Sequence, residues 1–126
     1  MLSALIGGRA RLIIASPRVS EILTTEKTLA EVEEYAVVLA RRRRIAEDIL
    51  LLGLAALPVT VVPQTDYAKS LPQARRRIER RDPDDVDILA LALQLNIPLW
   101  SNDKDLSNTG VEWLTTEDLL RRFGRI

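Results

Sequence analysis

The sequence contains no cysteine and no histidine among its 126 residues. The absence of cysteine excludes disulfide bonds, thiolate catalysis and cysteine-based zinc sites. The absence of histidine removes the most frequent general base and a common metal ligand. Carboxylates are therefore almost the only side chains that remain for binding a metal ion.

Long uninterrupted apolar runs are also lacking. Residues 49–62 carry no charge, but Gly53 and Pro58 interrupt them, and the run is shorter than the ~20 residues of a membrane span. Residues 1–9 have no basic stretch followed by a long apolar segment, so no secretory signal is predicted. We therefore expect a soluble, cytoplasmic protein with no membrane contact.

The charges balance at 18 acidic and 18 basic residues, so no strong overall field attracts polyanions. The basic residues are mostly arginine, whose planar guanidinium suits phosphate groups. Genome composition explains such usage equally well, and both explanations stay open. At this length the chain is expected to form one domain.

Helix and strand signals alternate along the chain. This alternation predicts an α/β fold with a parallel sheet and helices on both faces. The segment 59–62 is β-branched and bounded by prolines, which predicts a buried strand. The predicted helices cover residues 2–15, 26–39, 45–57, 66–80, 83–95 and 117–123, and the predicted strands cover residues 19–24, 59–62, 97–101 and 111–115.

Acidic residues gather where the apolar helix 83–95 begins. Asp82 is predicted to cap this helix, because Pro83 follows at the first helical position. Asp85 shares the face of Leu89, the expected buried side, whereas Asp87 points about 200° away at ~3.6 residues per turn. A carboxylate above an apolar stripe is costly without a partner, so Asp85 is the better candidate ligand. A capping role remains the alternative for Asp85.

A second acidic pair, Asp103 and Asp105, follows the predicted strand 97–101. Open α/β sheets place their ligands at the carboxyl ends of parallel strands. Ser101 lies at the strand end, where it could orient a ligand or a bound water. A simple turn is the alternative, because Ser-Asn-Asp is good turn chemistry. The pattern favours a site for Mg²⁺ or Mn²⁺, ions that prefer oxygen ligands.

These motifs together resemble the PIN domain, the nuclease domain of VapC-type toxins and related RNA-processing enzymes. The most specific part is Asp85 and Ala92 on one helix, followed by Pro-Leu-Trp-Ser-Asn-Asp-Lys-Asp-Leu at residues 98–106. Residues 16–32, which include Glu31, are similar to the family's second strand and the helix after it. The resemblance covers residues 1–126 as a single PIN-like domain. It implies a three-layer α/β/α sandwich with a mostly parallel central sheet.

The resemblance implies a metal-dependent endoribonuclease that hydrolyses RNA phosphodiester bonds with Mg²⁺ or Mn²⁺, as in the toxin of a toxin–antitoxin pair. An antitoxin protein and a second copy of the chain are the protein partners that it suggests. Glu21 is an alternative for the place of Glu31, and a solvated helix face is the alternative for the arginines at residues 75–81. The implied catalytic residues are Glu31, Asp85 and Asp103, the implied metal ligands are Asp85, Asp103 and Asp105, and the implied substrate-binding residues are Ser101 and Arg81.

One departure from the family concerns its first strand, which ends in an aspartate that binds the metal. That strand would precede Met1, so the sequence is expected to be truncated at its N-terminus relative to the family. Either the start codon is assigned too late, or the chain is a degenerate member that binds partners without cutting RNA. A receiver or phosphatase domain is a weaker alternative, because it needs an acidic residue after its first strand.

Overall fold

The structure is a computed structural model that describes residues 21–56 and 58–123. The helix predicted for residues 2–15 and the first part of the strand predicted from residue 19 lie outside the described residues. Short 3₁₀ turns, labelled η1 to η4, join the main elements. In chain order the helices and strands are β1 (Leu23–Thr25), α3 (Glu26–Arg43), α4 (Glu47–Ala55), β2 (Thr60–Val62), α5 (Leu71–Ile78), α6 (Val86–Leu95), β3 (Leu99–Trp100), β4 (Trp113–Leu114) and α7 (Thr116–Phe123).

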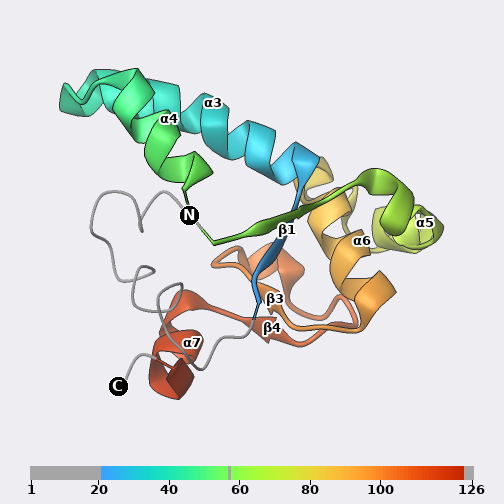
Figure 1. Ribbon diagram of the computed structural model, residues 1–126. Helices are drawn as coiled ribbons and strands as arrows, with labels where there is room; N and C mark the ends of the chain where they lie inside the picture. The colour runs from blue at the N-terminus through green and yellow to red at the C-terminus, as the bar shows by residue number, and fades with distance from the viewer. Residues whose placement is uncertain (1–20, 57, 124–126) are drawn as a thin grey trace.

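The strands pair in parallel, as the sequence predicts. β1 pairs with β2 in a register that places Thr24 beside Val61, and β3 pairs with β4 in a register that places Leu99 beside Trp113. Among the described residues these are two separate two-stranded sheets. In Figure 1, α3 and α4 lie on one side of the strands and α7 lies on the other.

The helix predicted from residue 26 begins where the sequence indicates. The backbone N–H of Thr28 donates a 3.0 Å hydrogen bond to the Thr25 hydroxyl, which caps α3 as expected for threonine at this position. α3 continues one turn further than predicted, to Arg43, and Arg44 then takes a left-handed conformation with φ 56°. α4 folds back beside α3, and the two form a helical hairpin that leads away from β3, β4 and α7 (Figure 1).

The core of the molecule is built around α6. Leu89 and Ala90 are fully buried there, and α6 contacts α5, β1 and β3. The helix ends at Asn96, as the sequence predicts: this residue has φ 53°, and its backbone N–H donates to the carbonyl of Ala92. α6 therefore contacts one strand of each pair, β1 and β3.

The strand predicted at residues 59–62 is present as β2, but the prediction that it is buried is wrong. Only Val62 is buried in β2, whereas Thr60 and Val61 are exposed. β2 pairs only with β1 among the described residues, so it is an edge strand with one open side. None of the helices within residues 21–56 and 58–123 is long and apolar enough to cross a lipid bilayer.

Candidate metal centre

The turn between α5 and α6 carries three aspartates, Asp82, Asp84 and Asp85. The backbone N–H of Asp82 donates to the carbonyl of Ile78 at 2.8 Å, which closes the chain after α5. The 3₁₀ turn η3, Pro83–Asp85, then leads directly into α6. Asp82 precedes this turn with φ −155° and ψ 86°, and its side chain makes no capping hydrogen bond. The prediction that Asp82 caps the helix is therefore wrong, and its carboxylate is left to face other groups.

The loop after β3 presents two more aspartates. The backbone N–H of Asp103 donates to the Ser101 hydroxyl at 3.0 Å, and that of Asp105 donates to the Asp103 carboxylate at 2.9 Å. Leu106 is fully buried and anchors the far end of the loop in the core. Ser101 is thus an acceptor that orients Asp103. These local hydrogen bonds are those of a tight turn, the alternative that the sequence offers for these residues.

The two segments bring three carboxylates together. Oxygen atoms of Asp82, Asp103 and Asp105 all lie within 4.8 Å of one another, and each side chain is half-buried. Asp103 and Asp105, two of the predicted ligands, belong to this group, and Asp82, which the sequence predicts as a helix cap, is its third member. Asp85, the other predicted ligand, is outside the group of three but interacts with the Asp82 and Asp103 carboxyls.

Asp85 lies beside this group and shares its electrostatics. Burial raises the pKa of Asp85 to about 8, and the neighbouring carboxyls of Asp103 and Asp82 add to the rise. The pKa of Asp82 is also raised, first by its interaction with Asp103 and then by burial. The pKa of Asp103 is lowered, because the Asp82 carboxyl and the backbone N–H of Asp105 stabilise its charged form. We call the group of Asp82, Asp103 and Asp105 the acidic cluster. Without a cation, a proton is therefore held at neutral pH beside this cluster, chiefly on Asp85.

Glu31 lies near the cluster but outside the group of three. Its side chain is half-buried on α3, and burial raises its pKa, helped by the negative charges of Asp84 and Asp82. The pKa of Glu31 on α3 is therefore sensitive to the charges of the turn before α6. Glu21, its alternative, is exposed and accepts a 3.4 Å hydrogen bond from Thr60.

Arg81 lies at the rim of the cluster. Its side chain is exposed and donates a 3.1 Å hydrogen bond to the carbonyl of Arg77. Its positive charge contributes to the low pKa of Asp103, after the larger effects of Asp82 and Asp105. Arg77 is the arginine of this segment that is half-buried, and it donates to the carbonyl of Thr109. Arg77 thus has a structural role, whereas Arg81 remains exposed beside the acids.

Asp87 has a different role from the one predicted. Its face of α6 was expected to point away from the core, but the side chain is buried and accepts hydrogen bonds from Tyr67 at 2.6 Å and from Gln64 at 3.2 Å. Sequence reasoning missed this contact, because its partners lie 20 and 23 residues earlier in the chain. Asp87 therefore has a structural role and does not belong to the acidic cluster.

The donor set fits a hard divalent cation. Three carboxylates from two segments converge, and such a group repels itself strongly in a partly desolvated place. Beside this group, burial raises the pKa of Asp85, and the Asp103 and Asp82 carboxyls add to the rise. A divalent ion would favour the charged forms of these carboxyls. Oxygen ligands of this kind are those that Mg²⁺ and Mn²⁺ prefer.

Comparison with known proteins agrees with this architecture and with the resemblance seen in the sequence. No match was found among curated proteins or among solved structures. The family model of the PIN domain matches residues 1–123, nearly the whole chain. The chain therefore belongs to the PIN domain family.

Proposed function

We propose that this protein is a metal-dependent endoribonuclease that hydrolyses RNA phosphodiester bonds. PIN domains are typically nucleases that depend on a divalent metal ion. The observation that carries the proposal is the convergence of Asp82, Asp103 and Asp105, which provides the acidic cluster that such an ion needs. Mg²⁺ or Mn²⁺ is the ion that we propose for this site.

The three clustered aspartates would hold the ion, and Asp85 and Glu31 would complete the acidic surroundings. A bound divalent ion polarises a phosphate and lowers the pKa of a water molecule that it binds. Burial raises the pKa of Asp85 to about 8 in the metal-free protein, and a bound divalent ion would favour its ionised form. Glu31 also has a raised pKa and faces the same region.

The substrate contacts that we propose are made by Arg81 and Ser101. Arg81 is exposed at the rim, where its guanidinium can bind a phosphate of the RNA backbone without leaving the vicinity of Asp103. The Ser101 hydroxyl accepts from the backbone of Asp103, and its own proton is directed elsewhere, toward a phosphate oxygen in our proposal. Together they would place a phosphodiester against the cluster.

The test is cleavage of a labelled single-stranded RNA with Mg²⁺, with Mn²⁺ and with EDTA. Wild-type protein should cleave with either ion and not with EDTA. Asp103→Asn should lose activity at least about 100-fold, because it removes a charge from the cluster while keeping the side-chain size. Asp66→Asn is the matched control, since Asp66 is an exposed aspartate on the 3₁₀ turn η1 (Gln64–Asp66), and it should cleave as wild type. Full activity in Asp103→Asn would exclude the assigned site.

A second candidate is a binding module that keeps the fold but does not cut RNA. The helical hairpin of α3 and α4 supports it, because Tyr35, Val38, Ile49 and Leu52 are large apolar side chains that are exposed there. Such a surface suits a protein partner, either a second copy of the chain or, if the protein is a toxin, its antitoxin. Binding of Mn²⁺ with no cleavage of RNA would favour this candidate over the nuclease.

A further inference from the structure

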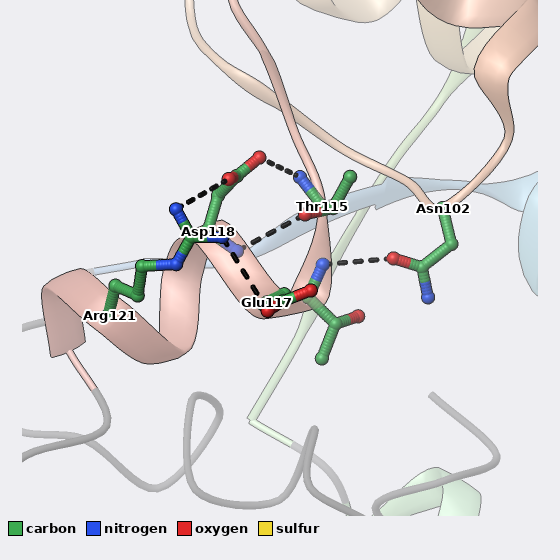
Figure 2. Close-up of polar contacts among 6 residues, drawn as sticks. Asn102, Thr115, Glu117, Asp118 and Arg121 are labelled. Atoms are coloured by element: carbon green, nitrogen blue, oxygen red, sulfur yellow. Dashed lines mark hydrogen bonds and ion pairs between the residues drawn. The ribbon is translucent and has the colours of Figure 1, made fainter.

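The N-terminus of α7 lies directly beside the loop that carries Asp103. Thr115 and Asp118 form a reciprocal cap there: the backbone N–H of Thr115 donates to Asp118 at 2.9 Å, and the backbone N–H of Asp118 donates to the Thr115 hydroxyl at 3.1 Å (Figure 2). Such a capping box satisfies two of the free donors at a helix start. The next donor, the backbone N–H of Thr116, needs an acceptor from outside the helix.

Asn102 supplies that acceptor. Its side-chain oxygen accepts a 2.9 Å hydrogen bond from the backbone N–H of Thr116, the first residue of α7, across 14 residues of sequence (Figure 2). The indole N–H of Trp100 donates to the Thr116 hydroxyl at 3.0 Å. Two residues of the segment that leads into the acidic loop are thus tied to one residue of α7.

The position of Asn102 gives this tie a consequence for the candidate site. Asn102 lies between Ser101, whose hydroxyl accepts from the backbone of Asp103, and Asp103 itself. The Asp103 carboxylate in turn accepts from the backbone of Asp105. Holding the Asn102 side chain therefore restricts the backbone rotation that would otherwise swing both carboxylates away from Asp82.

We infer that Asn102 is a positioning residue, which fixes the Asp103–Asp105 loop against the start of α7 and so holds two carboxylates of the acidic cluster in place. This inference rests on the proposed function for its effect on metal binding. The tie itself exists in the metal-free protein, so it can be measured there. Partners of this kind, which orient ligands without touching the metal, commonly change metal affinity by about 10- to 100-fold.

The experiment compares three variants of the full chain. Asn102→Ala removes the acceptor, whereas Asn102→Asp keeps a side-chain oxygen at the same distance from the backbone and adds a charge that a helix N-terminus favours. Asp118→Ala is the matched control, because it removes the other cap of the same helix and has no hydrogen bond to the acidic loop in the described structure. Two quantities are measured: hydrogen exchange of the Asp103 and Asp105 amides in EDTA, and Mn²⁺ affinity by calorimetry.

Asn102→Ala should exchange the Asp103 and Asp105 amides about tenfold faster and bind Mn²⁺ about tenfold more weakly. Asn102→Asp should restore both quantities to within about threefold of wild type, and Asp118→Ala should leave both there as well. Wild-type exchange in Asn102→Ala overturns the inference, and so does equal acceleration in Asp118→Ala or a failure of Asn102→Asp to restore slow exchange. If wild-type protein binds no Mn²⁺, the proposed metal site fails, while the exchange rates still decide the role of Asn102.

Discussion

The hydroxyl of Tyr67 donates a 2.6 Å hydrogen bond to the buried carboxylate of Asp87. This contact joins the segment after β2 to the first turn of α6, one turn from the acidic cluster. The pKa of Tyr67 is raised, first by burial and then by the Asp87 carboxylate, so the phenol remains a donor at all physiological pH values. The hydrogen bond between Tyr67 and Asp87 therefore attaches the first turn of α6, next to Asp85, to the segment after β2.

Replacement of Tyr67 by phenylalanine should lower the free energy of unfolding by about 1–3 kcal/mol, because a buried carboxylate loses its shortest hydrogen bond. Gln64 still donates to the same oxygen, which keeps the loss below that of a wholly unpaired charge. Denaturant unfolding measures the effect. Tyr35→Phe is the control, since Tyr35 is exposed on α3, and it should change stability by less than about 0.5 kcal/mol. Equal stabilities for the two variants would contradict a stabilising role for the hydrogen bond between Tyr67 and Asp87.

Asp82 and Asp84 are two residues apart and differ in their place relative to the cluster. Asp82 belongs to the group of three carboxylates, whereas Asp84 is exposed and outside it. Asp82→Asn should therefore weaken Mn²⁺ binding by at least about tenfold, and Asp84→Asn should leave it within about threefold of wild type. Calorimetric titration with Mn²⁺ measures the affinity of each variant. Equal losses would show that the ion responds to the general charge of this turn and not to the specific group.

Much of the fold follows from local signals in the sequence. The threonine cap of α3, Pro83 at the start of a helical segment and Asn96 at the end of α6 are each recognisable, because each satisfies a backbone requirement within a few residues. The pairing of Asp103 with Asp105 is predictable for the same reason, since both follow one strand in a single turn.

The parts that the sequence did not reveal depend on distant contacts. Asp82 joins the carboxylate group although its place in the sequence predicts only a helix cap, because the turn before α6 and the loop after β3 come together only in the folded chain. The burial of Asp87 requires Tyr67, and the tie at Asn102 requires Thr116. Neither partner can be identified from periodicity, because only tertiary packing brings these residues together.

The hairpin of α3 and α4 should mediate self-association if a second copy is the partner. On α3, Val38 lies four residues from both Glu34 and Arg42, so an antiparallel contact of two copies centred on Val38 would place opposite charges together. Leu52→Glu should then shift the protein toward the monomer in light scattering, because Leu52 is 72% exposed on α4. Leu95→Glu is the control, since Leu95 is exposed on α6 away from the hairpin. A monomeric wild-type protein would leave an antitoxin as the better candidate.

The acidic cluster should make the metal-free protein less stable as the pH rises. The pKa of Asp85 is about 8 in the folded chain against an ordinary value of 3.8, so folding favours its protonated form. This contribution to stability is full below about pH 4 and is lost as the pH approaches and passes 8, where the buried carboxyl ionises. Denaturant unfolding in EDTA from about pH 5.5 to about pH 8.5 should show a falling midpoint in wild type and a flatter one in Asp85→Asn. Mn²⁺ should flatten the wild-type profile too, because the bound ion stabilises the ionised carboxylates and displaces the proton. Parallel profiles for wild type and Asp85→Asn in EDTA would show that the stability of the fold does not depend on a proton at this carboxyl.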